Sequence, residues 1–197
     1  MPIDRIVLRL PRNALKSFIP LLGAGVGIQT PLGIRLQELL CDRLGIPQAY
    51  LQERIQTIFV NGRAVDRPEE IVIGRDAVIA LSAAMPGLAG ATLRRGGFFA
   101  AMRREISQRD AGTETSGGEG RITLKLFNML APEMGDRILQ GGVWLTAQRF
   151  IEFWREKSGE LLPAALQMRC NDTLVDAEQA RYWVPEAASV RLEVAWR

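Results

Sequence analysis

The side chains that most often carry enzyme chemistry are scarce in this sequence. It contains no histidine, and its two cysteines, Cys41 and Cys170, lie far apart and form no CxxC pair. The lack of histidine excludes Ser–His–Asp catalysis, Cys–His catalysis and the common zinc sites. No two Asp or Glu residues are spaced in a way that distinguishes a catalytic pair from ordinary surface carboxylates. We therefore expect a protein that is not an enzyme and that has no catalytic residue, metal ligand or cofactor.

A short segment near the middle of the chain has residues suited to binding. Leu93-Arg94-Arg95 precedes two glycines, and the apolar residues that follow fall on one stripe of a short amphipathic helix. Such a stripe either covers the seam between neighbouring domains or contacts another protein. The residues expected to contact a partner are Arg94, Arg95, Gly96, Gly97, Phe98, Phe99 and Met102.

This segment separates two similar halves of the chain. Residues 4–10 (DRIVLRL) recur as residues 120–126 (GRITLKL), and residues 77–83 (AVIALSA) are echoed by residues 189–195 (SVRLEVA). A repeat at a nearly fixed offset indicates one structural unit used twice.

We expect a domain in each half. The sequence predicts one unit at residues 1–90 and a second at 120–197, and the length of the chain suits two small domains. The connector at 91–119 is expected to hold the short amphipathic helix and a polar linker rich in Gly, Ser and Thr.

The order of elements within each half follows from apolar spacing and turn residues. Each half is expected to run strand, strand, helix, strand, short strand, final strand. Thr30-Pro31 is typical of a helix start, and Thr146 takes the same place in the second half. Asn61-Gly62 predicts a tight turn between two strands. We expect loops at 11–22 and 132–136, and an α+β fold with a mixed sheet of four or five strands on one main helix in each unit.

The first half resembles the small sulfur-carrier proteins of thiamine and molybdopterin biosynthesis, which have a β-grasp (ubiquitin-like) fold. Residues 59–65 (FVNGRAV) are similar to the family's V-N-G-x-x-V turn, and residues 73–81 (IGRDAVIAL) are similar to its G-D-x-V entry into the last strand. The resemblance covers about residues 3–90, and the second half matches the first better than it matches the family. It implies two tandem β-grasp units.

The resemblance also implies a requirement that the intact chain lacks. The family's activity needs a free C-terminal diglycine, whose carboxylate is adenylated and converted to a thiocarboxylate. The chain instead ends Ala195-Trp196-Arg197. Residues 93–97 are similar to the tail of ubiquitin-type modifiers, and cleavage after Gly97 would expose such a tail.

Two functions remain open. The first is a non-catalytic binding or scaffold protein that binds a protein partner or associates with itself. The second is the precursor of a sulfur carrier or modifier that is released after Gly97. The net charge of +3 and the lack of an aromatic-basic platform motif do not favour nucleic acid. We expect no membrane span, because no apolar run reaches the roughly 18 residues that a span needs. We expect residence in the cytoplasm, because the N-terminus has no signal-peptide core.

Overall fold

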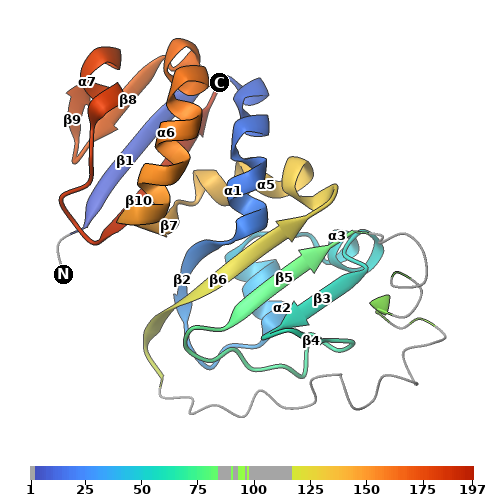
Figure 1. Cartoon of the computed structure of the whole chain (residues 1–197). Coiled ribbons are helices and arrows are strands. Elements are labelled where there is room, and N and C mark those ends of the chain that lie inside the picture. The colour runs from blue at the N-terminus through green and yellow to red at the C-terminus, as the bar shows by residue number, and fades with distance from the viewer. Residues whose placement is uncertain (1–2, 84–89, 91–92, 96, 98–116) are drawn as a thin grey trace. The chain divides into compact units, whose positions relative to one another are not determined.

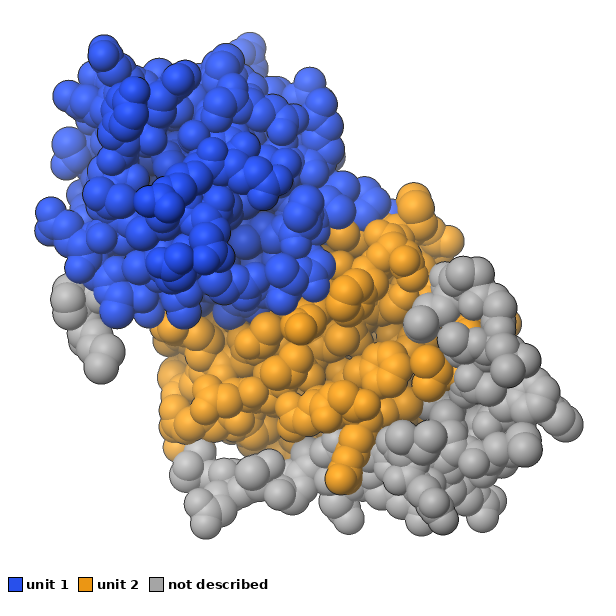
Figure 2. All heavy atoms as spheres, in the orientation of Figure 1, with its two compact units in different colours: residues 1–27, 132–197 blue, residues 28–131 orange. Residues whose placement is uncertain are grey.

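The computed structural model (Figure 1) describes residues 3–83, 90, 93–95, 97 and 117–197. It confirms the α+β class and mixed strand pairing. Contacts divide the chain into two compact units (Figure 2): unit 1 comprises Met1–Gly27 and Pro132–Arg197, and unit 2 comprises Ile28–Ala131. This division differs from the repeat boundaries at residues 90 and 120, because the N-terminal strand belongs to the unit that holds the C-terminus.

Unit 2 is built around a mixed sheet with one covered face. Its strands are hydrogen-bonded in the order β4-β3-β5-β6-β2, with β5 and β6 parallel and β3 antiparallel to β5. The strands are β2 (Val26–Pro31), β3 (Thr57–Val60), β4 (Arg63–Ala64), β5 (Val78–Ser82) and β6 (Glu119–Phe127). The helical elements are α2 (Leu36–Glu38), the π-helix η2 (Leu39–Arg43) and α3 (Gln48–Glu53). Leu36, Leu39 and Leu40 are fully buried, so this helical segment covers the core.

Unit 1 has a comparable sheet, assembled from both ends of the chain. Its strands follow the order β7-β10-β1-β8-β9, with β1 and β10 parallel. The strands are β1 (Asp4–Leu10), β7 (Val143–Thr146), β8 (Gln167–Cys170), β9 (Thr173–Val175) and β10 (Ser189–Trp196). The helices are η1 (Arg12–Phe18), α1 (Ile19–Ala24), α5 (Leu130–Gln140), α6 (Ala147–Ala164) and α7 (Ala177–Tyr182). Figure 1 shows the long helix α6 lying across β1 and β10.

The same asparagine contact appears in both units and identifies equivalent strands. In unit 2, the backbone N–H of Asn61 donates to the Val78 carbonyl, and the Val78 N–H donates to Asn61 Oδ1. In unit 1, the Asn171 N–H donates to the Arg5 carbonyl, and the Arg5 N–H donates to Asn171 Oδ1. Strand β1 therefore takes in unit 1 the place that β5 takes in unit 2, although its sequence repeats in β6.

Strict alternation decides which side of β1 enters the core. Ile6, Leu8 and Leu10 are fully buried, whereas Arg5 and Arg9 lie on the opposite, exposed side. This is the period-two pattern of a sheet with one covered face. Among the described residues, no helix has both the length and the apolar character that crossing a bilayer requires.

The aromatic side of α6 supplies most of the cover in unit 1. Phe150 stacks on Trp154 with ring centroids 5.6 Å apart, and Phe18 of η1 contacts Phe153 at 5.3 Å. As predicted, Thr146 caps this helix by accepting a hydrogen bond from the Arg149 N–H.

Three sequence-based predictions of local structure are wrong. Thr30 and Pro31 do not start a helix; they end strand β2, and the helix begins at Leu36. Thr30 is fully buried, so the core continues the strand past the expected cap. Residues 12–22 and 132–136 are helical rather than loops. Pro11 precedes η1, and Pro20 and Pro132 fall in the first helical turn, where no backbone N–H is needed for the helix.

Candidate functional site

The segment predicted to bind a partner is described only in part. Arg94, Arg95 and Gly97 lie within the described residues, whereas Gly96, Phe98, Phe99 and Met102 lie outside them. Arg94 is exposed, and Arg95 and Gly97 are half-buried. The structure therefore places the beginning of the segment and leaves its apolar stripe as a prediction.

Arg95 is held by unit 2. Its backbone N–H donates to the Gln56 carbonyl at 2.7 Å, and its Nη2 donates to the Leu51 carbonyl at 2.7 Å. The guanidinium borders a small cavity of about 100 Å³ that Asp66 and Glu69 also line. Burial lowers the pKa of Arg95, against the opposing effect of the two carboxylates. Arg95 therefore holds residues 94–95 against unit 2, and its guanidinium is less available to a partner protein than an exposed one would be.

A larger polar surface lies on the side of the unit 1 sheet opposite α6. We call it the outer face; it carries the outward-pointing residues of β1, β7, β8, β9 and β10. The members used below are Arg5, Val7, Arg9, Trp144, Arg169, Leu174, Arg191 and Glu193. Strand register sets them side by side: Arg5 lies opposite Arg191, Val7 opposite both Arg169 and Glu193, and Arg191 opposite Trp144.

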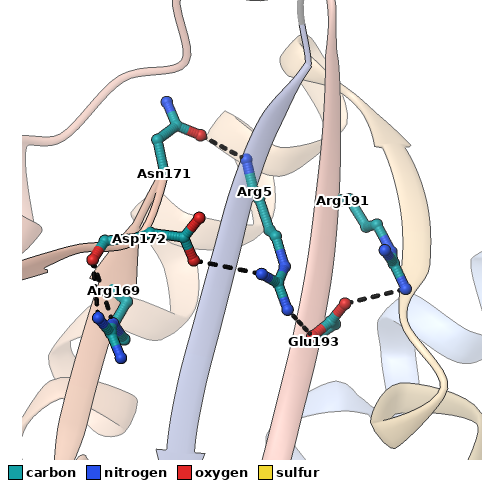
Figure 3. A network of polar contacts seen from close by, with 6 residues as sticks. All are labelled: Arg5, Arg169, Asn171, Asp172, Arg191 and Glu193. Atoms are coloured by element: carbon teal, nitrogen blue, oxygen red, sulfur yellow. Dashed lines mark hydrogen bonds and ion pairs between the residues drawn. The ribbon is translucent and has the colours of Figure 1, made fainter.

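Two carboxylates organise the arginines of this face (Figure 3). Arg5 reaches Asp172 at 3.2 Å through Nη1 and Glu193 at 3.0 Å through Nη2. Arg191 reaches the other oxygen of Glu193 at 2.9 Å. The hydrogen bond and charge of Glu193 raise the pKa of Arg5. Glu193 thus fixes two guanidinium groups in defined positions.

Arg169 is fixed by a backbone group at the adjoining turn. Its Nε and Nη2 donate to the carbonyl oxygen of Asp172 at 3.3 and 2.9 Å. Asn171 and Asp172 both have positive φ angles, of 47° and 66°. Both residue types tolerate this left-handed conformation better than most, which allows the turn to aim its carbonyl at Arg169.

Gly142 makes room for the Arg191 side chain. A Cβ atom at this position would lie 2.9 Å from Arg191 Nε and 3.1 Å from Glu193 Cγ. The φ angle of Gly142 is also +85°, a conformation that side-chain-bearing residues rarely adopt. The glycine therefore lets the Arg191–Glu193 pair lie against the backbone before β7.

The outer face carries an excess of positive charge. Arg5, Arg9, Arg169 and Arg191 are accompanied by only Glu193 and Asp172 among the charged groups described above. The Arg9 side chain is exposed, and it has no hydrogen bond or ion pair within the part of the chain that the structure describes. Leu174, which is 62% exposed, adds an apolar group opposite Arg169.

The chemical groups of this face are suited to binding anions. The nearby thiol of Cys170 is buried, and burial raises its pKa to about 11, so the nucleophilic thiolate is scarce at neutral pH. In residues 3–83 and 117–197, no cluster of three or more cysteine or carboxylate groups could hold a metal ion. What the face offers is guanidinium groups at fixed spacing.

Sequence reasoning placed the candidate site elsewhere and missed the outer face. Arg5 and Arg9 carry a readable signal, since residues four apart on a strand share one side. Arg169 and Arg191 join them only through the strand order, which no local pattern contains. No protein-family model, no curated protein and no solved structure matches the chain.

Proposed function

We propose that the chain is a non-catalytic binding protein whose outer face on unit 1 binds an acidic segment of a protein partner. The observation that carries the proposal is the set of four arginines on one open sheet face, two of them fixed by Glu193. Guanidinium groups bind carboxylates through paired hydrogen bonds, and fixed side chains lose less entropy on binding.

The proposal includes the finer reading of the fold as two β-grasp units. Each unit supports it with five strands and a central parallel pair. The helical segment of unit 2 lies between β2 and the β3–β4 hairpin, and α6 of unit 1 lies between β7 and the β8–β9 hairpin. The free thiols Cys41 and Cys170 agree with the expected cytoplasmic residence, because reducing compartments keep cysteines unpaired. In this reading the fold serves as a rigid body for binding.

The side chains of the two central strands favour an acidic peptide over nucleic acid. Platforms for single-stranded nucleic acid present aromatic rings on the strands that meet the bases. The outward residues of the two central strands include arginines, Val7, Glu193 and Ala195, and none of them is aromatic; the aromatic residue named on the outer face, Trp144, lies on the neighbouring strand β7.

The placement of Arg95 argues against a released carrier. A carrier tail must extend freely into the enzyme that activates it. The two hydrogen bonds of Arg95 to the Gln56 and Leu51 carbonyls instead hold the chain two residues before Gly97 against unit 2. Mass spectrometry of the protein from its native cell distinguishes the two: binding by the intact chain predicts full-length protein, whereas a carrier predicts a product ending at Gly97.

A labelled acidic peptide tests the proposal directly. A peptide of alternating Glu and Val places its carboxylates on one side when extended, and a Glu-to-Gln version is its neutral control. Fluorescence anisotropy should show saturable binding of the acidic peptide that weakens from 50 to 500 mM NaCl, because salt screens exposed charges.

Charge reversal on each unit supplies the matched variants. Arg9→Glu should weaken binding roughly tenfold, since it removes one attraction and adds one repulsion of about 0.7 kcal/mol each. Arg63→Glu makes the same change at an exposed residue of β4 in unit 2 and should leave binding unchanged. Equal losses in both variants, or equal binding of the neutral peptide, would contradict the proposal. Tighter binding of poly-uridine than of the acidic peptide would assign the face to nucleic acid.

A further inference from the structure

A second surface of unit 1 has the shape of a small-molecule site. A hollow of about 490 Å³ lies between α6 and the segment 181–184 that ends and follows α7. Its lining includes Ile151, Trp154, Arg155, Gly159, Arg181 and Trp183. This volume falls in the range of pockets that hold small organic ligands. None of its lining residues belongs to the outer face.

The aromatic wall of the hollow is held in place from behind. Phe150 stacks on Trp154, and Trp183 meets the Phe150 ring edge-on with centroids 5.7 Å apart. Trp154 Nε1 also donates to the Ala180 carbonyl at 2.8 Å. These contacts join α6 to α7, so the wall exists before any ligand arrives.

The rim of the hollow exposes large side chains at the end of α7. Tyr182 is 77% exposed and Val184 is 58% exposed, and both line the hollow. The aromatic ring of Tyr182 and the neighbouring Trp183 offer flat surfaces on which another ring can stack.

Two arginines give the hollow its charge preference. Arg155 on α6 and Arg181 on α7 are exposed, and neither side chain has a hydrogen bond or ion pair among the described residues. None of the described residues that line the hollow is acidic. Guanidinium groups bind carboxylate and phosphate oxygens in a bidentate manner.

Gly159 leaves open space along the lining of the hollow. A Cβ atom placed on this glycine would meet no atom within 4 Å. Glycine is the least favoured residue after proline inside a helix, and Gly159 lies within α6. The missing side chain therefore costs helix stability while it keeps space beside Trp154 and Arg155.

We propose that this hollow binds a ring-bearing organic anion, with the ring against Trp183 and Tyr182 and the anionic group between Arg155 and Arg181. A carboxylate and a phosphate ester share the chemistry that the two arginines recognise. The inference does not depend on the proposed function, because it concerns other residues and a ligand of another class.

The indole N–H signals of the four tryptophans provide a direct readout. Titration of ¹⁵N-labelled full-length protein with 2-naphthoate should shift the signals of Trp154 and Trp183, which line the hollow, and leave those of Trp144 and Trp196 in place. A parallel titration with 2-naphthyl phosphate shows which anionic group is preferred. The neutral 2-naphthamide should bind about tenfold more weakly, since it lacks the charge that strengthens such hydrogen bonds.

Three variants distinguish binding in the hollow from nonspecific binding elsewhere on the protein. Gly159→Met should abolish the shifts by filling the space, and thermal unfolding checks that the variant keeps its stability. Arg155→Gln should weaken binding several-fold, whereas Lys157→Gln removes the same charge from a residue of α6 outside the hollow and should have no effect. Equal binding of naphthoate and naphthamide, or unchanged binding in a folded Gly159→Met protein, would overturn the proposal.

Discussion

The carboxylate of Asp4 joins the two ends of the chain within unit 1, and its replacement by asparagine should destabilise that unit. Asp4 is 5% exposed and accepts hydrogen bonds from the N–H groups of Glu186 and Ala187, at 2.7 and 2.8 Å, and from Asn171 Nδ2 at 2.8 Å. An asparagine has one acceptor oxygen, so either orientation of its amide sets an NH₂ group against at least one of these donors. Turning Asn171 does not help, because its Oδ1 accepts from the Arg5 N–H.

The magnitude follows from the charge that is lost and the donor that is left without a partner. Hydrogen bonds to charged groups contribute about 1.5–3 kcal/mol, and a buried donor without an acceptor costs about 1–3 kcal/mol. Because these effects overlap, we expect Asp4→Asn to lower the free energy of unfolding of unit 1 by about 2–4 kcal/mol. Asp172→Asn is the matched control: its carboxylate is 75% exposed, and its surface pair with Arg5 should contribute less than about 1 kcal/mol.

Tryptophan fluorescence reports this unit selectively. All four tryptophans, Trp144, Trp154, Trp183 and Trp196, belong to unit 1. Urea unfolding followed by emission after excitation at about 295 nm should therefore shift to lower urea in Asp4→Asn and hardly at all in Asp172→Asn. Equal midpoints for Asp4→Asn and the unsubstituted protein would refute the assignment of β1 to unit 1.

The pH dependence of unfolding gives the same prediction a second test. Burial raises the pKa of Asp4, but its hydrogen bonds to Ala187, Asn171 and Glu186 outweigh burial and lower the pKa below its ordinary 3.8. The stabilisation is therefore fully present well above pH 3.8 and is lost as the pH falls through the lowered, folded-state pKa. Asp4→Asn should make the loss of unit 1 stability in acid shallower. An unchanged acid dependence would contradict this role.

Three further results are expected. Gly159→Ala should stabilise unit 1 by about 0.5–1 kcal/mol in urea unfolding, because it improves helix propensity and meets no atom; a loss of stability would show that the space is occupied. Gly142→Ala should destabilise the unit by about 1 kcal/mol or more and weaken acidic-peptide binding, because a Cβ there displaces Arg191 and strains a positive φ; unchanged binding would exclude Arg191 from the contact. In native protein at pH 8, a disulfide reagent should modify Cys41 before Cys170, since Cys170 is more deeply buried and its pKa is about 11; the reverse order would contradict the described burial.

Helix caps and tight turns were predictable from the sequence, because each depends on one or two neighbouring residues. The Thr146 oxygen caps α6, and Asn61-Gly62 forms the turn between β3 and β4, as the sequence predicts. Thr30 shows the limit of such reasoning: it occupies the place in the first half that Thr146 takes in the second, but its burial in the core keeps it in a strand.

The division into units could not be read from the sequence, because strand choice is not a local property. Strands β1 and β6 alternate apolar and polar residues almost identically, so either sequence suits a central strand. What places β1 between β8 and β10 is a set of distant contacts, including the bonds of Asn171 to Arg5 and of Asp4 to Ala187. The outer face depends on the same strand order, which explains why its four arginines were missed as a group.

Mapping the contact surface of the acidic peptide tests the central claim most directly. When the alternating Glu–Val peptide is titrated into ¹⁵N-labelled protein, the amide shifts should be concentrated on β1, β8 and β10 and should include Arg5, Arg9 and Arg169. In Arg9→Glu the same shifts should require about tenfold more peptide to reach half-saturation. Saturable shifts confined to unit 2 or to residues 93–97, or no saturable shifts at low salt, would contradict a binding role for the outer face.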